Sequence, residues 1–255
     1  MCRILVLPGH LQSKTLYAGR IAQLRRELEE DDIELVIVNP THLVQPRTEP
    51  DFAPFAYESD RSNTWAAYQW WGVEGEDELY KKRERQDFEA TLRYLRHILE
   101  TQGPFDGVWG FSQGGATAAL VAALCENPSL DPIFAAPPKI LSLAPIRPMK
   151  FAVIIAGFIP AGLGAEKYYT KKVRTPLLYV YGTGDVLVGE HRAEPLINSF
   201  SNRRVVFHSG GHFTPTKPTW RRFFRDYLRC FRTGYNAWQD VKLLTSPTSS
   251  PPNSP

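Results

Sequence analysis

The stretch GVWGFSQGG, residues 107–115, is the feature that most restricts which folds this 255-residue chain can adopt. An apolar run leads into it, Gly110 and Gly114 flank Ser112, and an Ala-rich segment follows. This is the G-x-S-x-G pattern, in which a strand turns sharply into a helix and the serine takes strained dihedral angles. Glycine is needed two residues before and after the serine because a side chain there would collide with the neighbouring strand or helix. The pattern predicts a serine hydroxyl lifted into the open.

Strand and helix patterns alternate along the rest of the chain. Short apolar runs bounded by Gly or Pro predict strands, and apolar residues at three- to five-residue steps predict helices. The expected strands are 3–8, 33–40, 105–111, 151–158, 176–182 and 203–211, and the clearest expected helices are 14–31, 76–103 and 114–126. Such alternation favours an α/β fold, with a mostly parallel twisted sheet and helices on both faces.

We expect residues 1–235 to form a single domain. Residues 39–75 are rich in Pro, Asp and aromatic side chains without clear periodicity, which is unusual inside a compact domain unless the segment covers something. We interpret it as an irregular cap or rim. Residues 244–255 are Ser/Pro low complexity and are expected to be disordered.

Composition excludes several functional classes. The formal net charge of +3 is too small to indicate a nucleic-acid surface. Cys2, Cys125 and Cys230 lie far apart and predict neither a disulfide framework nor a metal site, so no metal or other cofactor is expected. The first ten residues are too poor in apolar side chains for a signal peptide, and no apolar run is long enough for a membrane helix. We expect a cytoplasmic protein.

A serine hydroxyl becomes a useful nucleophile when a histidine takes its proton and a carboxylate orients that histidine. Where the serine stands on such a turn between a strand and a helix, the three residues follow the order Ser, acid, His along the chain. Asp185 follows the strand at 176–182, and His212 follows the strand at 203–211. The alternatives are Glu190 as the acid and His208 as the base, or a helix-capping role for Asp185 and an ordinary loop role for His212.

Acyl transfer through such a serine also requires backbone N–H donors for an oxyanion. The amide of Gln113, at the start of the helix that follows Ser112, is the first expected donor. The second is expected from the loop after the first strand, with the sequence PGHLQ. We assign it to the amide of His10, with the amide of Leu11 as the alternative.

Six segments together resemble the FSH-type serine hydrolase family, which has the α/β-hydrolase fold. They are ILVLPGHLQS, WAAYQWW, GPFDGVWGFSQGG, FAVIIAGFIP, TPLLYVYGTGDVLV and SGGHFTP, and the resemblance covers residues 1 to about 232. It implies a catalytic triad at Ser112, Asp185 and His212. Members often have His-Gly-Phe in the oxyanion loop, where this chain has Pro-Gly-His at residues 8–10.

The resemblance also implies substrate classes. Family members include short-chain esterases and thioesterases that trim or release polyketide chains from carrier-protein-bound synthases in secondary metabolism. The implied substrate is a small-molecule acyl ester or thioester, and an acyl carrier protein or polyketide synthase is the implied partner. The alternatives are a short-chain carboxylesterase of general metabolism and a non-catalytic binding protein on the same fold.

The aromatic segment and the segment at 158–169 are candidate walls of an acyl pocket. Leu11, Trp65, Trp70, Trp71 and Phe158 are the candidate substrate-binding residues. Packing in the core or in a lid is the alternative interpretation of the aromatic side chains.

Two basic helical segments, residues 81–85 and 220–232, have the charge to meet an acidic carrier protein. The alternative interpretation, and the one we favour, is that they are the solvated faces of ordinary helices.

Overall fold

A computed structural model of the chain describes residues 1–44, 66–72, 78–137, 145–233 and 238–243. The tail at 244–255, the candidate pocket residue Trp65 and most of the expected cap at 39–75 lie outside the described residues.

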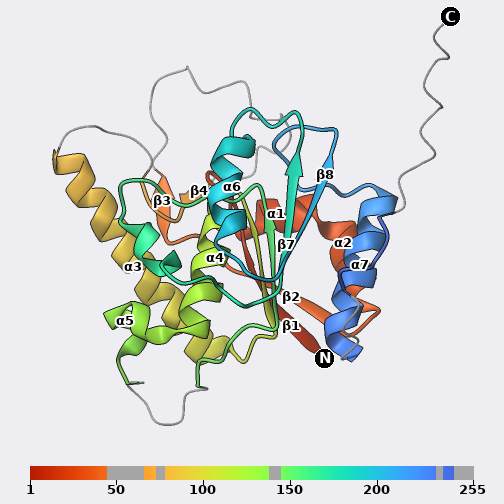
Figure 1. Ribbon diagram of the computed structural model, residues 1–255, viewed down its shortest axis with the longest axis horizontal. Coiled ribbons are helices and arrows are strands. Elements are labelled where there is room, and N and C mark those ends of the chain that lie inside the picture. The colour runs from red at the N-terminus through yellow and green to blue at the C-terminus, as the bar shows by residue number, and fades with distance from the viewer. Residues whose placement is uncertain (45–65, 73–77, 138–144, 234–237, 244–255) are drawn as a thin grey trace, which may run out of the picture.

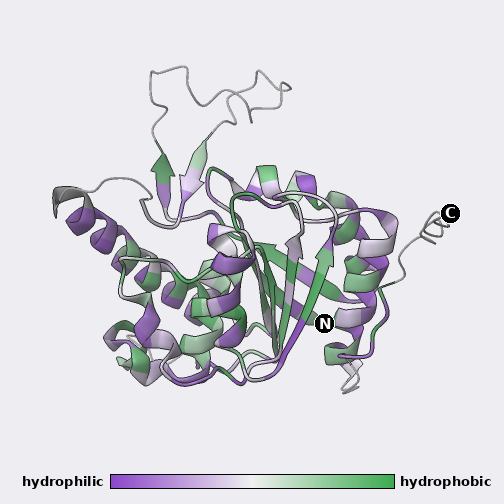
Figure 2. Cartoon of the chain, turned by 45° about the horizontal axis from the view of Figure 1, so that its top comes forward, coloured by the Kyte–Doolittle hydropathy of each residue, from purple (hydrophilic) through white to green (hydrophobic). Residues whose placement is uncertain are grey.

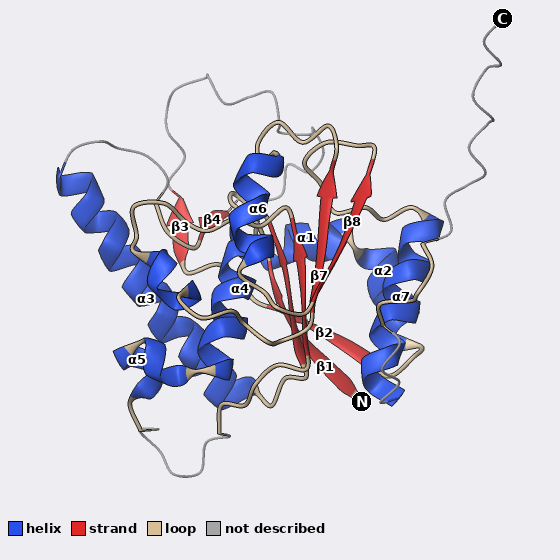
Figure 3. Ribbon diagram, viewed as in Figure 1, coloured by secondary structure: helices blue, strands red, loops and turns tan. Residues whose placement is uncertain are grey.

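Six parallel strands form the central sheet, in the spatial order β2-β1-β5-β6-β7-β8 (Figures 1 and 3). The strands are β1 (Cys2–Leu7), β2 (Ile33–Ile37), β5 (Gly107–Phe111), β6 (Phe151–Ile155), β7 (Leu177–Gly182) and β8 (Arg203–His208). The central strands β5 and β6 are buried throughout, as expected for strands covered on both faces. The predicted fold class is confirmed.

Helices cover both faces of this sheet (Figure 1). One face carries α3 (Glu78–Gln102), α4 (Gln113–Glu126), the short α5 (Pro132–Ala135) and α6 (Glu190–Asn198), together with the 3-10 turns η2 (Pro128–Leu130) and η3 (Ala165–Tyr169). The other face carries α1 (Lys14–Arg20), α2 (Ala22–Glu29) and α7 (Pro218–Thr233). Two hydrophobic cores result, one on each side of the sheet.

Strands β1 and β5 are neighbours in the sheet although about a hundred residues separate them, with Leu7 opposite Gly110. The chain first adds β2 on one side of β1 and then returns to add β5 on the other. In open α/β sheets, ligands bind beyond the carboxyl ends of the strands at such a reversal. The loop after β1 and the turn after β5 therefore meet at the favoured position for a site.

The single helix expected over 14–31 is two helices. Ser13 caps the first, its hydroxyl accepting the Leu16 amide hydrogen at 3.1 Å. Ile21 then leaves helical geometry, with φ −110° and ψ 15°, between α1 and α2. The side chain of Ile21 is fully buried. Periodicity alone did not reveal this break because the apolar spacing continues across it.

The expected irregular segment contains a small antiparallel pair. Strand β3 (His42–Val44) pairs with β4 (Ala67–Gln69), with Leu43 opposite Tyr68. Each strand is three residues long, too short for a periodicity signal. This pair lies beside the carboxyl end of the main sheet (Figure 1), where the Tyr68 carbonyl accepts the Leu11 amide hydrogen.

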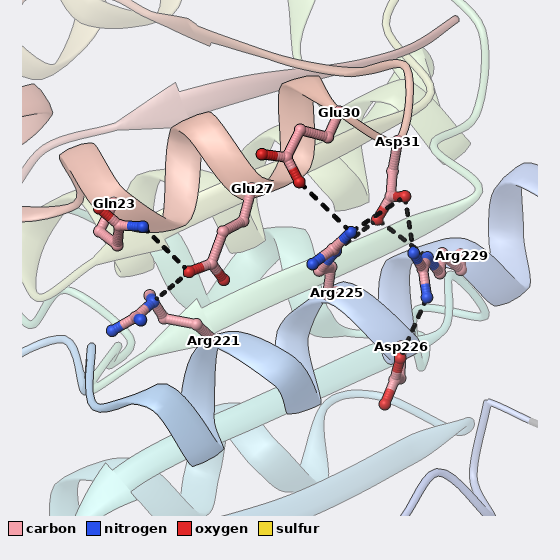
Figure 4. Close-up of polar contacts among 8 residues, drawn as sticks. All are labelled: Gln23, Glu27, Glu30, Asp31, Arg221, Arg225, Asp226 and Arg229. Carbon is pink, nitrogen blue, oxygen red and sulfur yellow. Dashed lines mark hydrogen bonds and ion pairs between the residues drawn. The ribbon is translucent and has the colours of Figure 1, made fainter.

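Helix α7 is strongly two-sided, and hydrophilic and hydrophobic residues alternate along its ribbon (Figure 2). Its aromatic residues belong to the core on this face of the sheet, and three of its arginines contact α2 and the turn after it. Arg225 and Arg229 both bind the Asp31 carboxylate, with shortest distances of 2.7 Å, and Arg221 binds Glu27 at 2.8 Å (Figure 4). These arginines are engaged within the chain. The interpretation of residues 220–232 as a carrier-docking surface stays a prediction.

No helix in the described part of the chain combines the length and the apolar character needed to cross a bilayer.

Candidate active site

Ser112 stands at the tip of a strained turn between β5 and α4. Its φ of 55° and ψ of −121° lie outside the regions that side chains favour. A side chain at Gly110 would overlap the Gly114 carbonyl in the first turn of α4, and one at Gly114 would overlap the Leu7 and Pro8 carbonyls at the end of β1. The two glycines thus permit the close approach that the sequence pattern predicted.

Ser112, His212 and Asp185 form a hydrogen-bonded chain. The Ser112 hydroxyl lies 2.8 Å from His212 Nε2, and His212 Nδ1 lies 2.7 Å from Asp185 Oδ2. The three residues follow β5, β8 and β7, whose carboxyl ends meet at one edge of the sheet. With Nδ1 donating to the carboxylate, Nε2 is left to accept the serine proton.

The carboxylate of Asp185 is held in place by its own loop. Its side chain is inaccessible to solvent, and Oδ1 accepts the amide hydrogens of Leu187 and Val188, each at 2.9 Å. These bonds leave Oδ2 facing the imidazole. The Phe111 ring lies against the imidazole with centroids 4.9 Å apart, which fixes the ring of His212 from the side of β5.

The alternative acid and base lie elsewhere. Glu190 is the first residue of α6. His208 ends β8, and its Nδ1 accepts the Gly210 amide hydrogen at 3.1 Å. Burial lowers the pKa of His208, which favours the neutral imidazole that this bond requires. The structure therefore gives His208 the task of shaping the loop that carries His212.

One expected oxyanion donor, Gln113, adjoins the serine in the chain. Amide groups in the first turn of a helix have no partners within the helix, so the amide of Gln113 lies at the positive end of α4. Across from it, Gly9 packs so closely on Phe111 that a Cβ would lie 2.9 Å from that ring. The Leu11 amide donates to the Tyr68 carbonyl at 2.8 Å, so the assignment of the second donor rests on His10.

The predicted acyl pocket is wrong for two of its residues. Trp70 is fully buried and Trp71 is 2% exposed, so neither indole offers a surface to a substrate. Both belong to the core on the α4 face. Leu11 is 45% exposed and Phe158 is partly buried, so these two candidates remain accessible.

The segment at 158–169 borders a hollow, but not at the triad. This hollow of about 390 Å³ lies between η3 and α6. Its lining residues are Ile159, Glu166, Tyr169, Thr170, Lys172, Pro195, Asn198 and Ser199. None of the predicted site residues is among them.

Sequence reasoning missed Tyr17. This residue of α1 is 1% exposed, and its hydroxyl accepts the Trp109 indole hydrogen at 2.9 Å and contacts the Thr214 hydroxyl at 3.1 Å. Trp109 belongs to the strand before Ser112, and Thr214 lies two residues after His212. A single tyrosine in a helical pattern carries no signal of contacts nearly two hundred residues away.

No group of three metal-ligating side chains occurs within the residues that the structure describes. Burial raises the pKa of the Cys2 and Cys125 thiols to about 12, so neither is a thiolate nucleophile near neutral pH.

Comparison with known proteins finds a serine hydrolase family and proteins named as esterases. The family model described as "Serine hydrolase (FSH1)" matches residues 1–224. The protein named esterase OVCA2 from Homo sapiens is 30% identical over 237 residues, covering 90% of this chain and 96% of that protein. Its counterpart from Danio rerio is 29% identical over 239 residues, covering 90% of this chain and 97% of that protein.

Solved structures with the same fold include esterase PE8, with a TM-score of 0.57 and 17% identity over 89% of this chain and 91% of that one. Acyl-protein thioesterase 2 from Zea mays has a TM-score of 0.54 and 19% identity over 90% of this chain and 93% of that one. At these identities the likeness shows the α/β-hydrolase fold.

Proposed function

Because the chain belongs to the serine hydrolase (FSH1) family and is an esterase-type enzyme, we propose that Ser112, His212 and Asp185 are its catalytic triad. The observation that carries the proposal is the continuous chain of hydrogen bonds, 2.8 Å from Ser112 Oγ to His212 Nε2 and 2.7 Å from His212 Nδ1 to Asp185 Oδ2. The substrate is a small-molecule ester.

In the acylation step, Ser112 Oγ attacks the ester carbonyl carbon while His212 Nε2 takes the hydroxyl proton. The carbonyl oxygen becomes an oxyanion, stabilised by the amides of Gln113 and His10. The intermediate collapses as the bond to the leaving group breaks, and His212 returns the proton to the departing oxygen. Asp185 stabilises the imidazolium without taking its proton.

In the deacylation step, water replaces the leaving group. His212 takes a proton from the water, the resulting hydroxide attacks the acyl carbon, and the proton passes to Ser112 Oγ as the acid product leaves.

Covalent labelling tests the proposal. A fluorophosphonate probe is expected to label the wild-type protein at neutral pH, and Ser112→Ala is expected to abolish both labelling and p-nitrophenyl ester hydrolysis. Ser129→Ala is the matched control, since Ser129 is an exposed serine in the turn after α4 and its loss is expected to leave both unchanged. An unlabelled wild-type protein, or labelling that survives Ser112→Ala, contradicts the proposal.

The finer prediction is a thioester substrate of polyketide type, presented by a carrier protein. A triad cleaves thioesters and oxygen esters alike, so the support comes from the family resemblance. The exposed basic residues Lys82 and Arg83 of α3 are among the candidates for docking. Reversing their charges is expected to slow hydrolysis of a carrier-bound thioester and to leave a free thioester unaffected.

A further inference from the structure

We infer that Trp70 positions the two halves of the oxyanion hole relative to each other, through buried hydrogen bonds to Gln113 on one side and to Pro8 on the other. We call these contacts the Trp70 clasp. The inference rests on the proposed function, since it assigns Trp70 a positioning role in the same reaction.

The first half of the clasp holds the nucleophile turn. The side chain of Gln113 is 2% exposed and bridges two backbone groups: its Oε1 accepts the Trp70 amide hydrogen at 2.9 Å and its Nε2 donates to the Trp71 carbonyl at 3.0 Å. The residue that offers its own amide to the oxyanion is thus tied through its side chain to the segment after β4.

The second half holds the loop after β1. The Trp70 indole N–H donates to the Pro8 carbonyl at 2.8 Å, two residues before His10. The Tyr68 carbonyl accepts the Leu11 amide hydrogen at 2.8 Å, one residue after His10. One short segment, 68–71, therefore holds the His10 loop on both sides and also holds the side chain of Gln113.

The segment itself is anchored from behind. The Trp70 carbonyl accepts the hydroxyl hydrogen of Thr91, a fully buried residue of α3, and the Trp70 ring lies 6.5 Å from that of Tyr94 on the same helix. These bonds lie in the interior, where water cannot replace a lost partner. The two oxyanion donors lie about a hundred residues apart in sequence, and the anchored segment sets the spacing between them.

Such spacing matters in the transition state. Donors stabilise the oxyanion when they lie about 2.7–3.1 Å from the position that it will occupy, and the ground-state carbonyl carries much less charge there. A displaced His10 loop is thus expected to lower kcat with little change in KM.

Two matched indole replacements test the inference. Trp70→Phe keeps an aromatic ring but removes the bond to Pro8. Trp71→Phe makes the same change in the adjacent residue, whose ring packs edge-on against Phe88 at 5.7 Å and takes no part in the clasp. We expect Trp70→Phe to lower kcat by about 10- to 100-fold with KM unchanged, and Trp71→Phe to leave both constants close to wild type.

A second readout reports on the oxyanion hole directly. An alkyl boronic acid forms a tetrahedral adduct with the serine, with an oxygen in the oxyanion position. Its inhibition constant is expected to weaken in Trp70→Phe by the same factor as kcat, a coupling that general destabilisation does not produce. Equal effects of Trp70→Phe and Trp71→Phe on kcat, or unchanged boronate affinity, would overturn the inference. A wild-type protein that neither hydrolyses esters nor reacts with fluorophosphonate would instead overturn the proposed function.

Gln113→Ala tests the same clasp at its other end, because it removes the side-chain bonds to Trp70 and Trp71 and keeps the backbone amide. It is expected to reproduce the loss in kcat, and it carries the test if Trp70→Phe shows no cooperative thermal unfolding. The double variant is expected to lose less than the product of the two single losses, since both loosen the same segment. Fully multiplicative losses would contradict a shared clasp.

Discussion

Helices α4 and α7 pack on opposite faces of the sheet and have similar lengths, 14 and 16 residues. In α4, every residue from 113 to 125 is buried, and its small side chains let it approach β5 and β6 closely. In α7, the aromatic side chains are buried in the core, and a row of arginines contacts Glu27 of α2 and Asp31 in the turn after it (Figure 4).

This contrast follows from what each helix carries. The first residues of α4 hold the serine and one oxyanion donor, so a displacement of α4 displaces the proposed chemistry. Close packing on all sides resists displacement because each neighbour would have to move as well. Helix α7 carries no site residue, and partly exposed ion pairs suffice to hold its polar side. We therefore expect small changes in α4 to have large effects on stability and activity, and changes in α7 to have small ones.

The largest effect is expected for one added methyl group at the start of α4. Gly114→Ala places a Cβ on the Leu7 and Pro8 carbonyl oxygens, and because two backbone segments must separate, we expect a loss of about 3 kcal/mol in the free energy of unfolding. Displacing the turn is also expected to lower kcat/KM by about 100-fold or more. Chemical denaturation and ester hydrolysis measure the two effects.

Gly19→Ala is the matched control on the opposite face. A Cβ at Gly19 in α1 meets no atom within 4 Å, and alanine favours a helix, so this variant is expected to gain up to about 1 kcal/mol in stability with unchanged activity. Equal losses for the two variants would break the comparison.

A smaller effect is expected when the hydroxyl of Tyr17 is removed, in α1 on the face of the sheet that α7 covers. Tyr17→Phe leaves the buried Trp109 indole N–H without its acceptor and releases Thr214, so it is expected to cost about 1–3 kcal/mol in the free energy of unfolding. Because Thr214 lies two residues after His212, kcat is expected to fall as well. Burial raises the pKa of Tyr17 to about 12, so both effects should be constant from pH 6 to pH 9.

Tyr227→Phe is the control for this change. Tyr227 is fully buried on the same face, and its hydroxyl has no hydrogen-bond partner among the described residues. Removing an unsatisfied hydroxyl is expected to leave stability unchanged or to raise it by up to about 1 kcal/mol. A larger loss for Tyr227→Phe than for Tyr17→Phe would show that volume, and not hydrogen bonding, dominates on this face.

Much of the fold could be predicted from sequence, for an identifiable reason. Each central strand is an apolar run that ends near Gly or Pro, and burial on both faces leaves no polar alternation to confuse the pattern. That Ser112, Asp185 and His212 lie near one another could be predicted equally well, because residues just beyond parallel strands share one edge of the sheet. The structure has them within hydrogen-bond distance.

The features that could not be predicted depend on contacts between residues that are distant in sequence. An aromatic residue looks the same in a sequence whether it lines a pocket or fills a core, so Trp70 and Trp71 were assigned to the wrong surroundings. The side chain of Gln113 was overlooked since its partners lie some forty residues earlier. The arginines of α7 resembled a solvated or docking surface because the matching acids lie in α2 and in the turn after it, almost two hundred residues away.

The smallest effect is expected in the charged contact between α2 and α7. Asp31→Asn removes the charge that Arg225 and Arg229 share (Figure 4). Hydrogen bonds from Arg225, supported by Arg229, lower the pKa of Asp31 from 3.8 to about 2. Since both guanidinium groups are partly exposed, we expect a loss of about 1–2 kcal/mol in the free energy of unfolding near pH 7. Asp226→Asn, which alters a 43% exposed partner of Arg229 at 3.6 Å, is the control and should cost less than about 0.5 kcal/mol.

The pH dependence of this contribution has a definite sign. The folded protein binds a proton at Asp31 less readily than the unfolded chain, so the stabilisation is fully present above the ordinary pKa of 3.8 and is lost as the pH falls toward 2. The difference between wild type and Asp31→Asn should therefore shrink over that range. It should also shrink at high salt, because screening weakens partly exposed ion pairs. Throughout, kcat near neutral pH is expected to match wild type, since α7 carries no site residue. A loss of kcat in Asp31→Asn comparable to that in Gly114→Ala would mean that the charged contact also holds the site, and the contrast between the two faces would fail.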